Sequence, residues 1–276
     1  MIALNLGGLD IRAYSVGGVE TCFVLPRYDV CLDIGRCPRG AERQGHLLLT
    51  HAHIDHAAGL PYYVSLRALM SMKPPRVACP EASAETLKTI LDTWATLQAD
   101  SDRLHLVAVK PGDRIPLKHG AYAVAYRSPH RIACVGYTIY STKKKLKDEL
   151  TGLPGEEIAK RARAGEEVNT VTESAEVSFP GDTRIEVVET EPSVRTAKVL
   201  ILESTFVGDS IAPEKAKRTG HVHLDQIAER ADLFENEHIL LTHFSRRHSA
   251  AQIHDEAKKK LPPHLYERVT LLVHEG

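Results

Sequence analysis

The sequence of 276 residues has no run of 18 consecutive apolar residues, so we expect no membrane-spanning helix. Its first residues, MIALNLGGLDIRAYS, lack a positively charged leader, and glycine and charged residues interrupt their apolar positions, so we expect no secretory signal. The chain also lacks an excess of either charge, with a formal net charge of −1 and a pI of about 7.0. Overall attraction to nucleic acid or to an anionic membrane is therefore excluded, and any such contact must come from a local patch.

The chain has few cysteines, and their spacing shows no paired motif. The chain has five cysteines, an odd number, and no C-x-x-C pair. This usage favours a reducing compartment. We therefore predict a cytoplasmic protein, or a nuclear one if the source is eukaryotic.

Short apolar segments alternate with helical ones along the chain. Hydrophobic residues make up 43% of it, enough for the core of one large domain covering residues 1–276. We expect strands at 21–26, 28–35, 46–50, 76–80, 104–109, 122–128, 135–141, 175–181, 198–204, 238–244 and 268–273. We expect helices at about 57–72, 83–97, 155–164, 221–233 and 249–261, the last opened by the capping-box sequence SAAQ. This order predicts an α/β layered sheet fold.

Two apolar stretches of the chain are nearly identical. HLLLTH begins at His46 and HILLTH begins at His238. The similarity suggests two related halves. Buried strands of any sheet also resemble one another, so both interpretations remain open.

One segment interrupts the alternation of strands and helices. Residues 141–174, STKKKLKDELTGLPGEEIAKRARAGEEVNTVTES, are rich in both charges and poor in apolar residues. We interpret them as an arm inserted into the domain and leaving its surface. The alternative is a solvated helix and loop, which is the usual structure of a mixed-charge segment.

The sequence HAHIDH concentrates four metal-ligand residues in six positions: His51, His53, Asp55 and His56. In extended or turning backbone, alternate side chains share a face, so His51 and His53 converge on one point while Asp55 and His56 turn toward a second. Two neighbouring metal ions are therefore more plausible than one.

Four side chains cannot complete two coordination shells, so further ligands are expected where other strands end. Three residues follow apolar strand candidates in this way: His130, Asp182 and His243. Five imidazoles and two carboxylates carry about −2 of ligand charge against two divalent ions, which leaves a net positive site suited to an anionic phosphodiester. Histidine-rich ligation favours zinc over magnesium, with manganese or iron as alternatives.

These residues resemble the signature of the metallo-β-lactamase fold hydrolases, H-x-H-x-D-H followed by a distant His, Asp and His. The resemblance implies a four-layer αββα sandwich. The stretches THAHIDHAAGLP, GDTR, LILESTF, GHVHLDQIAE and ILLTHFSRR further resemble the successive motifs of ribonuclease Z, the endonuclease family that removes 3′ trailers from precursor tRNA. GGVETCFVLP, LDIGRCP, MKPPRV, GYTIYSTKKKLK and GLPGEEI are similar to its short, plant-type form, and together the motifs cover nearly the whole chain.

The resemblance implies a role for each site residue. One Zn²⁺ would be bound by His51, His53 and His130, and a second by Asp55, His56 and His243, with Asp182 bridging. Asp55 would also orient or deprotonate the attacking water.

The resemblance further implies that Glu203 and His221 protonate the leaving 3′ oxygen, and a His held by a carboxylate suits general acid work. His223 is a rival to His221 for this role. Arg247 would hold phosphate, and Thr183 would brace Asp182.

The resemblance also implies partners. The arm would contact precursor tRNA through the basic residues Lys143, Lys144, Lys145 and Lys147. The family works as a homodimer, without an organic cofactor and without a membrane. Two alternatives stay open: a dinuclear metallohydrolase acting on a small phosphodiester, ester or lactone, and a nonenzymatic RNA-binding or scaffold protein.

Overall fold

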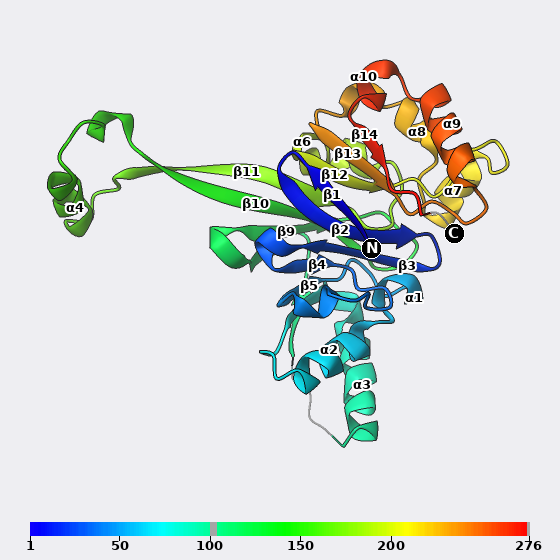
Figure 1. The fold of residues 1–276 in the computed structure, drawn as a ribbon, viewed down its shortest axis with the longest axis horizontal. Coiled ribbons are helices and arrows are strands. Elements are labelled where there is room, and N and C mark those ends of the chain that lie inside the picture. The colour runs from blue at the N-terminus through cyan, green and yellow to red at the C-terminus, as the bar shows by residue number, and fades with distance from the viewer. Residues whose placement is uncertain (100–103, 275–276) are drawn as a thin grey trace.

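Two stacked sheets organise the chain in the computed structural model, which describes residues 1–99 and 104–274 (Figure 1). Within these residues the first sheet has seven strands in sequence order: β1 (Ile2–Leu6), β2 (Leu9–Val16), β3 (Glu20–Leu25), β4 (Val30–Leu32), β5 (His46–Leu48), β6 (Arg76–Pro80) and β7 (His105–Val109). The second also has seven: β8 (Arg114–Pro116), β9 (Tyr122–Arg127), β10 (Val135–Leu146), β11 (Asn169–Phe179), β12 (Val199–Glu203), β13 (His238–Thr242) and β14 (Val269–Leu271).

Helices lie outside the two sheets. Next to the first sheet are α1 (Ile54–Ala57), α2 (Leu60–Leu69) and α3 (Glu81–Leu97). The second half carries α5 (Val187–Thr190), α6 (Pro192–Thr196), α7 (Pro213–Thr219), α8 (Leu224–Ala228), α9 (Ala250–Lys260) and α10 (Pro263–Tyr266). Short 3₁₀ turns are η1 (Pro26–Tyr28), η2 (Ala41–Arg43), η3 (Lys118–Gly120), η4 (Asp148–Leu150) and η5 (Ala231–Leu233). No helix within the described ranges is both long and apolar enough to cross a membrane.

Apolar layers on both faces of each sheet hold this arrangement together. In β5, Leu48 belongs to the core between the sheets, together with Phe23, Tyr137 and Ile201. Its neighbour Leu47 belongs instead to the core under α2 and α3. A strand covered on both faces needs a continuous apolar run, which explains why LLL at 47–49 and VLIL in β12 are apolar at successive positions and do not alternate with polar residues. The predicted α/β fold with four αββα layers is confirmed.

The two halves share one strand topology. In each sheet the first four strands pair antiparallel and the last four pair parallel. The similar stretches HLLLTH and HILLTH nevertheless occupy different places, because β5 is the fifth strand of its sheet and β13 the sixth. Their likeness therefore reflects burial of parallel strands and not equivalent positions.

The predicted helices need two corrections. The helix expected at 57–72 is two helices, α1 and α2, because Gly59 lies so close to the backbone of Cys37 that the chain turns there. The helix expected from His221 begins only at Leu224, since the His223 side chain caps it by accepting from the amide of Asp225. The Ser249 capping box of α9 is confirmed, with Ser249 and Gln252 bonding each other's backbone amides.

The charged segment 141–174 has more order than the sequence suggested. β10 and β11 continue past the sheet as a two-stranded ribbon, and Ser141 pairs with Ser174 at its base. Figure 1 shows this ribbon projecting from the body with α4 (Gly155–Arg163) at its tip. Residues 141–174 are called the arm below.

Candidate metal centre

The ends of several strands carry the seven predicted ligands to one place. His51 and His53 follow β5, and Asp55 and His56 lie in α1 directly after them. The other three side chains come from loops that follow β9, β11 and β13: His130, Asp182 and His243. Ligand atoms of His51, His53, His130 and Asp182 lie within 4.8 Å of one another, as do those of Asp55, His56 and His243.

A buried carboxylate, Asp33, orients two of the imidazoles. His56 donates from Nδ1 to Asp33 over 2.7 Å. The hydroxyl of Thr50 donates to the same carboxylate at 2.8 Å, so its oxygen is left to accept from Nδ1 of His51 at 3.0 Å. Because each Nδ1 carries a proton, Nε2 is the nitrogen that each ring turns inward, where it can bind a metal ion once it is deprotonated.

Two further imidazoles are held in the same way. Nδ1 of His130 donates to the carbonyl oxygen of Gly220 at 2.8 Å, and a carbonyl can only accept. Thr205 gives its hydroxyl proton to Glu203 and therefore accepts from Nδ1 of His243 at 2.9 Å. Both rings thus also present Nε2 lone pairs to the site.

These inward nitrogens lie close to one another. Nε2 of His56 and Nε2 of His243 are 3.4 Å apart. Nδ1 of His53 lies 3.0 Å from Nε2 of His51 and 3.2 Å from Nε2 of His130. Lone pairs so close repel unless a cation lies among them, so the donor geometry fits bound metal ions.

Asp182 lies between the two ligand groups. Its carboxylate oxygens are 3.2 Å from His56, 3.3 Å from His243 and 3.7 Å from His51. Its Oδ1 is buried and has no hydrogen-bond partner among the described residues. Burial raises its pKa, but His243 and His56 outweigh this and hold the pKa of Asp182 well below its usual range. A buried anionic oxygen without a hydrogen-bond donor is suited to bind a metal ion.

Protonation of the imidazoles also suits metal binding. Burial lowers the pKa of His51, of His53 and of His130, so these rings are neutral at pH 7 and offer lone pairs. Burial opposes charge on His56 too, yet the Asp182 and Asp33 carboxylates raise its pKa well above the usual range. A cation that binds there must displace this proton, so the affinity for metal decreases as the pH is lowered.

The chemistry of the donors indicates the class of ion. Five imidazoles and two carboxylates offer nitrogen and oxygen ligands in two adjacent groups. Such a set suits divalent Zn, Mn or Fe, whereas Mg²⁺ prefers oxygen and water.

Glu203 and His221 form a second functional pair at the edge of this centre. Nδ1 of His221 donates to Glu203 at 2.9 Å, so Nε2 remains for the cavity that His221 lines. Burial lowers the pKa of His221, but the Glu203 carboxylate outweighs it and raises the pKa to about 9. The imidazolium is therefore the stable form in the metal-free protein.

His223 is occupied elsewhere. It is fully buried, its Nδ1 accepts from the amide of Asp225 and its Nε2 lies 3.2 Å from the carbonyl oxygen of Gly208. The geometry favours His221 over His223 as the group that meets a substrate. The expected brace from Thr183 to Asp182 is wrong, because the Thr183 hydroxyl donates to Arg184 and its amide donates to Glu203.

The residues that orient the ligands were not predicted from the sequence. Asp33 and Thr205 were not singled out, nor were Gly17 and Gly18, whose backbone covers the site: the Gly18 amide donates to Asp55 at 2.9 Å. Asp33 had a detectable signal, because it follows the apolar run VCL as His130 and Asp182 follow theirs. No local pattern marks Gly17, because only the tertiary fold brings it next to His243.

Three cations surround a cavity of about 410 Å³ over the ligands: Arg131, Lys215 and Arg247. None of their side chains has a carboxylate within ion-pair distance among the described residues. The arm differs, since Lys145 pairs with Asp148 and Lys147 with Glu149. Lys143 is exposed, and the side chain of Lys144 lies outside the described part of the structure.

The fold and this centre define a class of protein. The chain is similar to the metallo-β-lactamase fold protein YhfI from Bacillus subtilis, with a TM-score of 0.65, 15% identity and coverage of 95% of this chain and 96% of that one. It is also similar to the human short-form tRNase Z, ELAC1, with a TM-score of 0.58, 19% identity and 95% coverage of both chains. The chain is a metallo-β-lactamase fold protein.

The sequence comparison shows the family. No protein-family model matches the chain. Over 272 residues it is 39% identical to tRNase Z TRZ1 of Arabidopsis thaliana, covering 98% of this chain and 97% of the relative. The chain belongs to the tRNase Z family.

The orienting role of Asp33 is testable. Replacing it by Asn leaves one acceptor oxygen for three donors, so the His51 and His56 rings lose their fixed orientation. We expect Asp33→Asn to weaken metal binding about 10- to 100-fold. Competition with a chromophoric chelator measures the affinity.

Asp29→Asn is the matched control, because Asp29 shares the left-handed backbone conformation of Asp33 but contacts Lys118 and Gly45 instead. Asn tolerates that conformation in both variants. Equal affinities for the two variants would contradict the role of Asp33.

Glu203 is expected to control the protonation of His221. In metal-free Glu203→Gln the pKa of His221 should fall from about 9 toward its ordinary 6.5, because burial is then opposed only by the more distant Asp182 carboxylate. Because the wild-type pKa is raised, the ion pair stabilises the fold below pH about 6.5, and this is lost as pH rises through about 9. NMR titration of the imidazole measures the change, with Glu186→Gln as control, since Glu186 pairs with Lys217. An unchanged titration in Glu203→Gln would refute the assignment.

Proposed function

We propose that this chain is a metal-dependent endoribonuclease that cleaves the phosphodiester at the 3′ end of precursor tRNA, removing the trailer and leaving a 3′-hydroxyl. The observation that carries the proposal is the proximity of the Glu203–His221 pair to two metal-ligand groups, since His221, Asp182 and His243 also lie within 4.8 Å of one another. Membership in the tRNase Z family supports the choice of substrate.

The proposed cofactor is two Zn²⁺ per chain, with Mn²⁺ or Fe²⁺ as alternatives. His51, His53 and His130 would hold one ion, and Asp55, His56 and His243 the other, with the buried Asp182 shared. When bound, the ions would supply positive charge to the phosphoryl oxygens and lower the pKa of a water.

The chain's own residues then handle the protons. Asp55 is held by the Gly18 amide and has a pKa well below its usual range, because His243 and His56 outweigh the effect of burial. It orients the attacking water and accepts its proton. As the water oxygen bonds to phosphorus, the bond from phosphorus to the 3′ oxygen breaks, and Nε2 of His221 gives its proton to that oxygen.

Phosphate contacts are proposed at two distances from the reaction. Arg247, Arg131 and Lys215 line the cavity and would neutralise the flanking phosphates. Residues 1–276 form one domain whose arm, residues 141–174, would meet the tRNA body through Lys143, Lys144, Lys145 and Lys147. The acidic partners of Lys145 and Lys147 offset their charge. The arm would therefore extend the contact to the tRNA body and add little electrostatic affinity for it.

A homodimer is proposed from an exposed apolar face. Of the eleven large apolar side chains exposed among the described residues, seven lie between Ile54 and Leu97, on α1, α2, α3 and the turn after α2. Leu69 is 82% exposed and Leu97 76%. Exposed apolar side chains gathered on neighbouring helices favour a protein interface. The face belongs to neighbouring helices, since the side chain of Gln98 donates to Ser65.

The proposed compartment is reducing, the cytoplasm or the nucleus. The five cysteines are buried and unpaired in the structure. Such thiols persist where disulfide formation is suppressed.

Cleavage of a labelled precursor tRNA carrying a 3′ trailer tests the function. We expect the zinc-loaded protein to make one cut at the start of the trailer and to leave a 3′-hydroxyl. His221→Gln should slow single-turnover cleavage by about 10²- to 10⁴-fold with its metal content unchanged, because the proton donor is lost. His53→Ala should lose metal and activity together.

Bis(p-nitrophenyl) phosphate, a small phosphodiester, is the second substrate. Shortening the arm between Lys147 and Val168 should weaken cleavage of precursor tRNA and leave this hydrolysis intact. No cut in protein that holds two metals and hydrolyses the small substrate would overturn the assignment to tRNA. An inactive His223→Ala beside an active His221→Ala would refute the choice of acid.

The dimer is testable by mass. Wild-type protein should sediment at about 61 kDa, twice the chain mass of 30.5 kDa. Trp94→Glu combined with Leu97→Glu should give monomers, because charge on an apolar interface is costly to bury. Leu233→Glu, also at an exposed apolar position but in the other half, should stay dimeric. A monomeric wild-type protein at micromolar concentration would contradict the proposal.

A further inference from the structure

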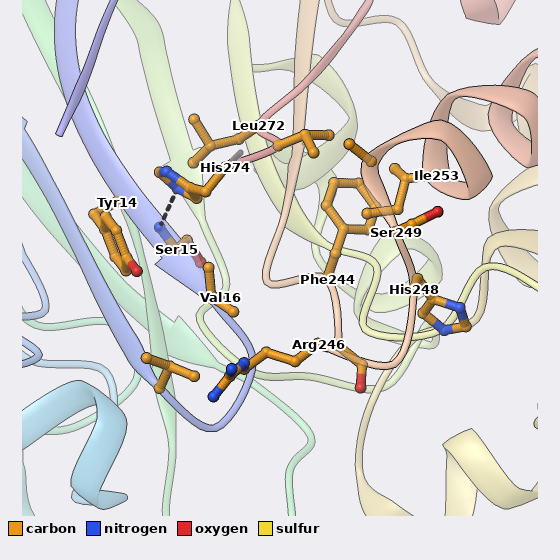
Figure 2. A pocket seen from close by; sticks show the side chains of 14 residues that line it. Tyr14, Ser15, Val16, Phe244, Arg246, His248, Ser249, Ile253, Leu272 and His274 are labelled. Atoms are coloured by element: carbon orange, nitrogen blue, oxygen red, sulfur yellow. Dashed lines mark hydrogen bonds between the residues drawn. The ribbon is translucent and has the colours of Figure 1, made fainter. Parts of the chain in front are cut away.

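A second cavity, of about 650 Å³, lies beside the metal centre and has no part in the function described so far. Figure 2 shows it between the end of β2, the loop from β13 to α9 and the segment after β14. Its volume falls in the range of about 300–1,000 Å³ that is common for small-ligand sites.

Only a thin ridge of backbone separates this cavity from the metal centre. Gly17 forms an isolated parallel bridge with Ser245, and its amide donates to the Phe244 carbonyl at 3.1 Å. Val16 lines the second cavity, Gly17 lines the first and Ser245 lines both. The ridge carries no side chain at Gly17 or Gly18, so an extended strand can pass over it.

The walls of the second cavity suit a planar ring attached to an anion. Tyr14 and His274 lie against each other with ring centroids 4.2 Å apart, the buried Leu272 lies near His274, and the buried Phe244 lies on the opposite side beside Ile253 (Figure 2). No carboxylate lines the cavity among the described residues, whereas the exposed Arg246 does.

A polar group adds to this fit. Arg246 is exposed at the cavity and has no carboxylate within ion-pair distance among the described residues. An aromatic surface beside an unpaired arginine is the kind of site that binds single-stranded nucleotides.

The placement of the acid decides which part of the RNA lies there. His221 must face the departing 3′ oxygen, which belongs to the tRNA body. Arg131 packs on Gly220, next to His221, so the body side of the cut lies toward Arg131 and Lys215. The trailer must leave by another path, and the ridge of Gly17 and Gly18 borders the cavity beside His243.

We infer that the second cavity receives a base of the 3′ trailer, from one of the first three nucleotides after the cut. The strand crosses the ridge at Gly17 and Gly18, its base lies against Tyr14 and Phe244, and Arg246 meets its phosphate. The inference rests on the proposed function and adds a trailer subsite to it.

Abasic substitution tests the subsite. Precursor tRNAs that lack the base at the first, second or third trailer position are cleaved under single-turnover conditions by zinc-loaded wild-type protein. Removing the base at one of these positions is expected to lower kcat/KM roughly tenfold or more. Tyr14→Ala, and Ala250→Trp, which fills the cavity, should lose a similar factor on the intact precursor.

The two losses should not add. On the abasic precursor the Tyr14→Ala and wild-type rates should agree within about twofold, because each change removes the same contact. Hydrolysis of bis(p-nitrophenyl) phosphate should be equal in all proteins, which excludes misfolding or metal loss. Arg246→Ala should weaken cleavage of the intact precursor, because it removes the contact to the trailer phosphate, and Arg76→Ala, at an exposed arginine on β6, is its control.

Two outcomes separate the proposals. Normal cleavage by wild-type protein with no effect of any missing base, or fully additive losses, would overturn the subsite alone. Failure of the wild-type protein to cut any precursor would overturn the proposed function and the subsite together.

Discussion

Two buried carboxylates hold the metal centre in its geometry. Asp33 accepts a hydrogen bond from Nδ1 of His56 and orients His51 through Thr50. Glu203 binds His221 directly and orients His243 through Thr205. Because the carboxylates set the tautomers, the imidazole lone pairs turn inward before any ion arrives. Preorganisation of this kind lowers the cost of assembling two coordination shells.

The sheets make this arrangement possible by ending at one place. Asp33 follows β4 and Glu203 closes β12, and each next strand in its sheet runs parallel to it. Carboxylates and the histidines they orient therefore leave neighbouring strands at the same edge. Asp33 and His243 both adopt a left-handed backbone, with φ of 53° and 60°. Strain of this kind persists at functional sites when surrounding contacts hold it in place.

Charge is local in this molecule. The chain is nearly neutral overall, yet Arg131, Lys215 and Arg247 lie unpaired around one cavity, and acids pair with several arm cations. A neutral surface with a cationic centre reduces nonspecific attraction to nucleic acid while retaining attraction at the site. The arm and the trailer subsite would then supply specificity through shape and stacking, which depend less on salt.

By itself the sequence determined the eleven apolar strands, the capping box of α9 and the cluster of candidate ligands, because each depends on a local pattern of a few residues. Only the tertiary structure decided which side chains orient them. Asp33 and His56 are 23 residues apart, and Gly18 and Asp55 are 37 apart. Contacts over such distances depend on strand register and on how loops turn at the sheet edge. Strand register and loop conformation also placed Gly17 against Ser245 and formed the cavity beside the metal centre, which no local sequence pattern predicts.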